Sequence, residues 1–122
     1  MQAKIDRNVM AISDLEISAV GKISDKVVVR KVRLAYAKDA SGVITDVVEA
    51  VKYDCVDPDS YDSFTLKVET ARAVITNEEI ERSEEAVLIS VPVEDVKIRP
   101  YAIEFGKAKV SIVAPFVTLV KQ

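Results

Sequence analysis

Apolar and polar side chains alternate along most of this chain, which is the pattern of half-buried β-strands. The alternation is clearest at residues 64–69, where Phe64, Leu66 and Val68 are predicted to face the core. The preceding segment, residues 56–63, is rich in Asp and Ser around Pro58 and predicts a loop. Clustered acids of this kind can bind calcium, but a solvated turn whose Asp side chains bond their own backbone is the simpler interpretation.

Two longer strands are predicted upstream of this loop. Residues 24–39 and 43–55 are rich in Val, and Asp39-Ala40-Ser41-Gly42 between them has the composition of a hairpin turn. One parity of the second strand carries Val43, Val47, Val51 and Tyr53 and is predicted to face inward. Nearer the N-terminus, residues 9–23 predict a further strand with a bulge near Ser13-Asp14.

One short helix is predicted, beginning after Thr76 and ending near Ala86. Thr76 has the position of an N-cap, and Glu79 is placed to bond back to the Thr76 amide, which together make a capping box. Ile75 and Ile80 have the spacing of a hydrophobic staple.

Strand-forming sequence resumes after the helix. Val87, Ile89, Val91 and Val93 share one parity, while Pro92 on the other parity indicates an edge or a bend. Gly106 marks a turn or bulge between two further strands. Pro115 is predicted to interrupt the last strand, after which residues 116–120 can pair again.

The order of these elements matches a small Greek-key barrel of the oligonucleotide-binding (OB) type, in which a helix separates two groups of strands. Sandwiches have similar orders. We therefore expect a mainly β fold, either an OB-like barrel or a sandwich with one short helix between the strand groups. All 122 residues are expected to form a single domain.

Composition removes most catalytic chemistry. The chain has no His and only one Cys, Cys55, which excludes histidine-activated nucleophiles, multi-cysteine zinc sites and an internal disulfide. Its three glycines form no phosphate-binding loop. We therefore expect no enzyme activity, no metal and no cofactor. The absence of a long apolar run predicts a cytoplasmic protein that does not enter a membrane.

Charge is distributed unevenly along the chain, whose net charge is -3. Residues 1–38 contain eight cations and four acids (+4), whereas residues 39–122 contain nine cations and sixteen acids (-7). Five of the early cations lie within residues 26–38, which contain no acid. If this polarity persists in space, one face of the molecule is basic.

In OB barrels, such a basic face on the early strands binds single-stranded nucleic acid. The cations contact the phosphates, and the bases stack on flat aromatic rings. The candidate contacts are Lys26, Arg30, Lys31, Arg33, Tyr36, Tyr53, Arg99, Tyr101, Lys107 and Lys109. The alternative is that Tyr36 and Tyr53 fill the core while the cations only keep a long strand soluble.

Residues 63–122 resemble a family of small accessory proteins encoded on conjugative elements and plasmids of Gram-positive bacteria. The resemblance rests on a helix start with Ile75, Thr76, Glu78, Glu79 and Ile80, on Pro100-Tyr101, and on a final strand with Ala before an apolar run. It implies a barrel related to single-stranded DNA-binding proteins and a role in helicase-driven unwinding, and it carries over no catalytic residue.

Two functional hypotheses follow. The first is a non-catalytic single-stranded DNA-binding accessory protein that supports replication or conjugative transfer of a mobile element, with a helicase or a relaxase as its protein partner. The second is a β-rich homo-oligomeric interaction or assembly module encoded by a phage or plasmid, in which exposed strand edges pair across a symmetry axis.

Overall fold

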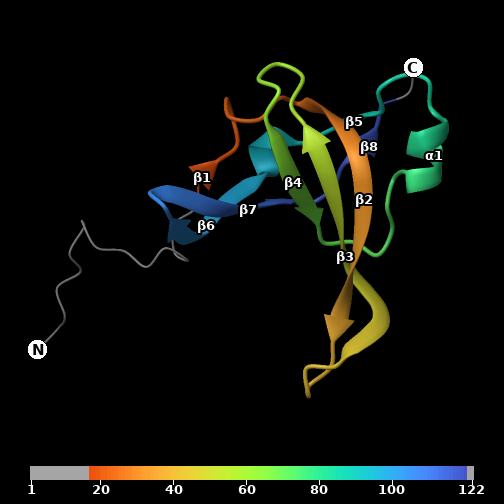
Figure 1. Cartoon of the computed structure of the whole chain (residues 1–122), viewed down its shortest axis with the longest axis vertical. Coiled ribbons are helices and arrows are strands. Elements are labelled where there is room, and N and C mark those ends of the chain that lie inside the picture. The colour runs from red at the N-terminus through yellow and green to blue at the C-terminus, as the bar shows by residue number, and fades with distance from the viewer. Residues whose placement is uncertain (1–16, 121–122) are drawn as a thin grey trace, which may run out of the picture.

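Eight strands form one mixed sheet in the computed structural model, which describes residues 17–120 (Figure 1). The strands are β1 (Ile17–Ser18), β2 (Lys26–Lys38), β3 (Ile44–Val56), β4 (Ser63–Val68), β5 (Leu88–Ser90), β6 (Lys97–Glu104), β7 (Lys107–Ala114) and β8 (Thr118–Leu119). Their spatial order is β1-β6-β7-β4-β3-β2-β5-β8, and all neighbours are antiparallel except β4 and β7, which are parallel.

The sheet of the described residues is open. Its two outermost strands, β1 and β8, have two residues each and do not pair with one another. The mainly β class is thus confirmed, but the expected closed barrel is not found, because such short edge strands provide no ladder that joins the ends of the sheet.

One face of β2, β3 and β4 carries the hydrophobic core, and we call it the core face. Val29, Val32, Tyr53, Leu66 and Val68 lie on it, and none of them is more than 7% exposed. The short strands and loops after β4 contribute the rest of the same cluster. The inward positions predicted for residues 64–69 are confirmed, because burial follows the period of two along β4.

The far end of the β2–β3 hairpin projects beyond this core as a two-stranded arm, residues 34–48 (Figure 1). Its apolar side chains are exposed, Val43 and Val47 at 60% each and Ile44 at 66%. The predicted inward face of residues 43–55 is therefore right for Val51 and Tyr53 and wrong for Val43 and Val47. The reason is that β4 pairs with β3 only from Val51 onward, so no third strand or layer covers the arm.

The helix α1 (Asn77–Arg82) follows β4 and begins with the predicted capping box at Thr76. It ends at Ser83, earlier than the expected Ala86, because the Ser83 backbone is extended and its hydroxyl donates to the carbonyl of Glu85. The Asn77 side chain accepts from the amide of Val32 at 2.8 Å and donates to its carbonyl at 2.9 Å. The helix thereby blocks part of the otherwise open edge of β2.

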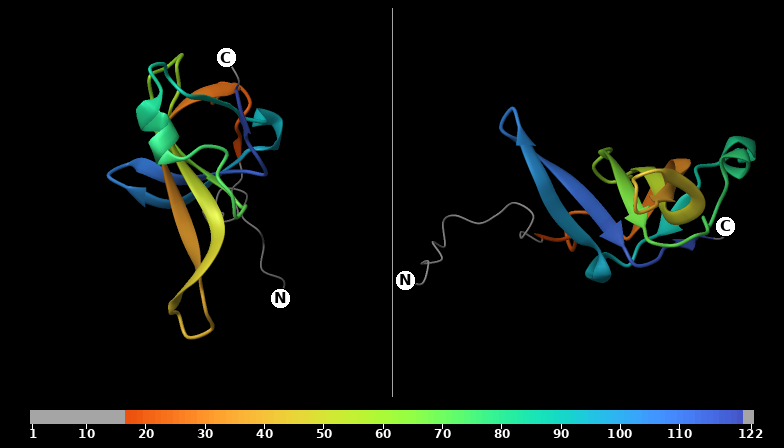
Figure 2. Two further views of the ribbon diagram at one scale, coloured as in Figure 1. Left: turned by 90° about the vertical axis from the view of Figure 1, so that its right-hand side faces the viewer. Right: turned by 90° about the horizontal axis from the view of Figure 1, so that it is seen from below.

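The predicted bends after the helix are confirmed. Pro92 precedes a 3₁₀ turn, η2 (Val93–Asp95), and β7 stops at Ala114 before Pro115. Between β6 and β7, Phe105 (φ 51°) and Gly106 (φ 74°) form the hairpin turn in the left-handed region. Figure 2 shows that the β6–β7 hairpin projects away from β2, β3 and β4, although β7 still pairs with β4 at its C-terminal end.

The acidic loop after β3 is fastened to the chain before β2. Asp57 is only 5% exposed, and its carboxylate accepts hydrogen bonds from the amide (3.0 Å) and hydroxyl (2.8 Å) of Ser24 and from the amide of Asp59 (2.9 Å). Asp57 is thus a buried anchor, while residues 58–62 are exposed and the bond from the Asp59 amide to Asp57 is of the side-chain-to-backbone kind predicted for this turn. The described residues hold no group of three acidic or sulfur side chains placed to bind a metal ion. The bulge predicted at Ser13-Asp14 lies outside the described residues.

Candidate nucleic-acid interface

The face of β2, β3 and β4 opposite the core, which we call the outer face, carries a row of cations. Arg33 on β2 lies directly opposite Lys52 on β3, and Lys52 lies directly opposite Lys67 on β4. In the next row, Lys31 lies opposite Asp54, which lies opposite Thr65. The strand register therefore lines up three cations from three adjacent strands.

Like charges directly opposite one another on a sheet are destabilising, so this row needs a counter-charge. Arg33 has one, because its Nη2 lies 2.7 Å from Oδ1 of Asp54, which also accepts from the Thr65 hydroxyl at 3.0 Å. Lys52 and Lys67 are half-buried and form no ion pair with any residue of the described chain. Two of the three opposed cations thus remain uncompensated.

The Asp54 carboxylate stays ionised near neutral pH. Partial burial opposes its ionisation, but the hydrogen bonds from Arg33 and Thr65 and the positive charges of Arg33 and Lys31 outweigh that effect and lower the pKa of Asp54. Asp54 therefore acts as an internal anion at the edge of the cationic row.

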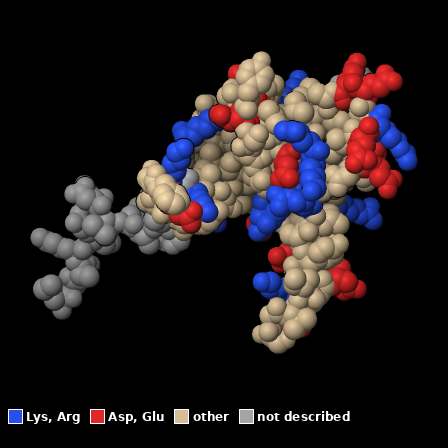
Figure 3. Space-filling view, viewed as in Figure 1, with Lys and Arg blue, Asp and Glu red and all other residues tan. Residues whose placement is uncertain are grey.

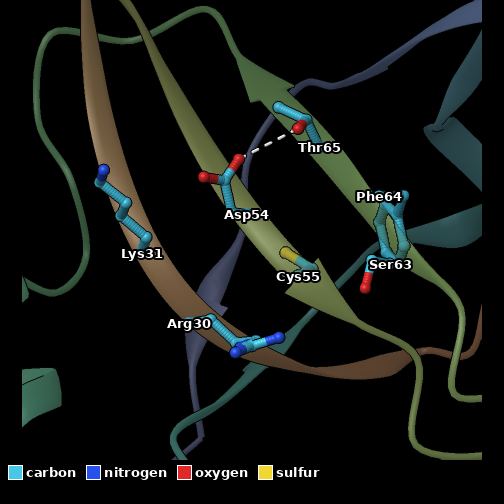
Figure 4. A pocket seen from close by; sticks show the side chains of 7 residues that line it. All are labelled: Arg30, Lys31, Asp54, Cys55, Ser63, Phe64 and Thr65. Carbon is cyan, nitrogen blue, oxygen red and sulfur yellow. Dashed lines mark hydrogen bonds between the residues drawn. The ribbon is translucent and has the colours of Figure 1, made fainter.

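The outer face is hollowed into two adjoining depressions that share Thr65. The first has a volume of about 500 Å³ and lies around Arg30, Lys31 and Asp54 (Figure 4). The second has a volume of about 510 Å³ and lies between the cationic row and the β6–β7 hairpin, with Tyr101 on its far wall. In Figure 3, Lys and Arg gather over β2–β4, beside a hollow that separates them from the β6–β7 hairpin. We call the two depressions together the basic groove.

A β-bulge lies at each end of the basic groove. In β2, the pairing skips Arg30 between Val29 and Lys31, and in β6 it skips Tyr101 between Pro100 and Ala102. Bulges bend a strand and redirect a side chain, and they are frequent next to functional sites. Arg30 and Tyr101 are both exposed, Tyr101 at 62%, and each lines its end of the groove.

The structure brings four of the ten predicted contact residues together in the basic groove, and these are Arg30, Lys31, Arg33 and Tyr101. The prediction that Tyr53 exposes its ring to a base is wrong. Tyr53 is 0% exposed, and its hydroxyl accepts from the amide of Val74 at 3.0 Å, so the ring belongs to the core. Burial accordingly raises the pKa of Tyr53, which the Val74 hydrogen bond only partly offsets.

The other five predicted residues do not line either depression. Lys26 lies at the start of β2 beside β5, and Tyr36 lies on the arm, where it is 43% exposed. Lys107 and Lys109 lie on β7 near the hairpin turn, and Lys109 forms an ion pair with Glu104 at 2.9 Å. Arg99 is an exposed residue of β6.

Lys52 and Lys67 belong to the groove although neither was among the predicted contacts. Both have the outward parity of their strands, so the alternation alone would have placed them on the outer face. No local pattern in the sequence indicates that β3 and β4 align them with Arg33, because this alignment depends on the strand register.

The thiol of Cys55 lies beside the first depression (Figure 4). Cys55 is 2% exposed, and burial together with the nearby Asp54 charge raises its pKa to about 12. The thiol is therefore protonated at neutral pH and does not act as a nucleophile there.

Acidic side chains gather at the other end of the molecule. Glu78, Glu79, Glu81, Glu84 and Glu85 lie on and just after α1, and all are exposed. Helix α1 and the β6–β7 hairpin lie on opposite sides of the body in Figure 1, and Asp and Glu cluster on the α1 side in Figure 3. The described molecule thus has a basic groove and an acidic end.

No family model, no curated protein and no solved structure gives a significant match to this chain. No helix among residues 17–120 has the length and apolar character needed to cross a bilayer.

Proposed function

We propose that this chain is a non-catalytic single-stranded DNA-binding accessory protein whose binding surface is the basic groove. The observation that carries the proposal is the row formed by Arg33, Lys52 and Lys67, in which like charges are aligned across three strands and, among residues 17–120, Asp54 alone forms an ion pair with the row. Such a row favours a ligand that brings several negative charges at once. A nucleic-acid backbone is a ligand of this kind.

The exposed ring at the end of the groove favours a single strand over a duplex. Tyr101 offers a flat surface on which an unpaired base can stack, and each such contact contributes about 1–3 kcal/mol to binding. In a duplex the bases are stacked on each other and do not reach such a ring. The ligand is therefore a strand whose phosphates contact the cations and whose bases are free.

The biological setting belongs to the same proposal and rests on the resemblance of residues 63–122 to accessory proteins of conjugative elements and plasmids. In that setting the protein would hold the strand that a helicase or a relaxase exposes during replication or transfer of the element. A relation to OB-like proteins is part of the proposal too. The order of a β2–β4 meander, a helix and a β6–β7 hairpin supports it.

Fluorescence polarisation with labelled oligo-dT tests the proposal. Affinity should fall steeply with salt, and the slope of log K against log salt should be about -0.7 per phosphate contact, which gives roughly -2 to -3 for three or four contacts. A duplex of the same length should compete poorly. No change in polarisation at low salt up to tens of micromolar protein would remove the proposal.

A second candidate function is a homo-oligomeric assembly module, as in a phage- or plasmid-encoded structural protein. The arm favours it, because a two-stranded ribbon without a covering layer is marginally stable alone and its open edges can pair with another chain. Light scattering over a range of protein concentration and salt separates the two candidates. A strictly monomeric protein under all conditions would speak against assembly.

A further inference from the structure

We infer that the bound single strand runs across the β-strands, from Tyr101 on β6 to Arg33 on β2, and occupies about four to six nucleotides. This inference rests on the proposed function, since it describes how the basic groove holds its ligand.

The direction follows from the arrangement of charges. Along β3 the outer face changes sign between Lys52 and Asp54, so a backbone that followed this strand would meet a carboxylate. Across the strands, Arg33, Lys52 and Lys67 follow one another without an acid between them. Along β2, Lys31 and Arg33 also follow one another, but both lie beside Asp54. The crossing path instead leads from Arg33 to Lys52 and Lys67, which form no ion pair with any described residue.

The length follows from the number of strands crossed. The path passes β6, β7, β4, β3 and β2, which are neighbours in the sheet. Four spacings of about 4.8 Å give roughly 19 Å across the strands. Lys67 lies opposite Val113, whereas Tyr101 lies beside Val110, so the path also shifts by three residues, or about 10 Å, along the strands and is roughly 21 Å long. A stacked single strand rises about 3.4 Å per nucleotide, so at most about six nucleotides fit, and a more extended strand has fewer.

The end point follows from the environment of Tyr101. The bulge directs this residue into the groove, where Val110 at 39% exposure adds an apolar surface beside the ring. Tyr61 is more exposed, at 82%, but it lies in the acidic loop between Asp59 and Asp62 and lines none of the basic groove. Tyr61 is therefore a matched control, because it is an exposed ring without a row of cations.

A length series tests the inference. The affinity of unlabelled oligo-dT of about two to twelve nucleotides is measured by competition, for the intact chain and for the Tyr101→Ala, Tyr101→Phe and Tyr61→Ala variants. Affinity should rise steeply with length up to about six nucleotides. Beyond that length it should rise only slightly, because a longer strand offers more positions at which the same short site can bind.

The variants should separate the two tyrosines. Tyr101→Ala should weaken binding about fivefold to 150-fold, which corresponds to the loss of one stacked base. Tyr101→Phe should retain most of the affinity, because it keeps the ring, and Tyr61→Ala should bind like the intact chain. Melting temperatures measured alongside show whether each variant is folded.

The outcomes distinguish this inference from the function on which it rests. Absence of binding at every length would overturn both. Binding that continues to strengthen steeply beyond about ten nucleotides, or equal affinities for Tyr101→Ala and Tyr61→Ala, would overturn the crossing path and its end point while the proposed function stands.

Discussion

The core face and the outer face of β2, β3 and β4 are made of alternate residues of the same three strands, and they have opposite effects on the stability of the sheet. On the core face, Leu66 and Tyr53 are 0% exposed, and their burial stabilises the fold. On the outer face, Lys52 and Lys67 oppose each other without a carboxylate between them, and this arrangement destabilises the sheet. The core face thus serves folding, whereas the outer face carries the charges on which the proposed ligand binding rests.

The largest expected effect of a single substitution is on the core face. Leu66→Ala should lower the free energy of unfolding by about 2–5 kcal/mol, because it leaves a cavity beneath β4. The neighbouring Lys67→Ala is the control and should leave stability unchanged or slightly raised. Urea unfolding of both variants measures this difference, and equal losses would show that the two faces do not differ as described.

A smaller effect on the same face concerns a hydrogen bond. Tyr53→Phe keeps the ring but removes the acceptor of the Val74 amide, so it should cost about 1–2 kcal/mol. Binding of oligo-dT by the folded variant should be unchanged, because the Tyr53 ring does not reach the groove. A variant that is as stable as the parent but binds DNA more weakly would contradict this assignment of Tyr53.

The smallest expected effect lies on the outer face. Asp54→Asn removes the carboxylate that pairs with Arg33, so affinity for oligo-dT should rise about twofold to fivefold, as expected for a partly exposed ion pair of up to about 1 kcal/mol. Unchanged or weaker binding would show that Arg33 does not contact the ligand.

The pH dependence follows from the same carboxylate. Because the pKa of Asp54 is lowered, this group stays ionised well below neutral pH, and its competition with a phosphate persists. The affinity of the unaltered protein should therefore show no rise between about pH 7 and pH 5, where an ordinary Asp is ionised as well. A rise within this range, absent in Asp54→Asn, would mean that the Asp54 pKa is raised instead.

The parts of the fold that depend on residues close together in the chain can be predicted from the sequence. The alternation along β4, the capping box at Thr76 and the turn at Gly106 are all local patterns, and all three are confirmed. The parity of residues 43–55 also predicts that Tyr53 faces inward, and its burial agrees with that pattern rather than with the expected contact with a base.

The parts that the sequence did not reveal depend on contacts between distant segments. The parallel pairing of β4 with β7 and the open ends of the sheet follow from the tertiary fold. The bulge that directs Tyr101 into the groove has no distinct local pattern, and the alignment of Lys52 with Lys67 depends on the register between two strands. Exposure of Val43 and Val47 depends on where β4 stops pairing with β3.

The central claim is that the outer face carries uncompensated cations for a nucleic-acid backbone, and the Lys52→Gln/Lys67→Gln double variant tests it most directly. Its affinity for oligo-dT should fall at least about tenfold, and its salt slope should become less negative by about 1.4, which is the contribution of two phosphate contacts. Its melting temperature should stay the same or rise, since opposed like charges have been removed. Arg82→Gln on α1 is the matched control and should bind like the unaltered protein. A double variant that keeps both its affinity and its salt slope would contradict the account.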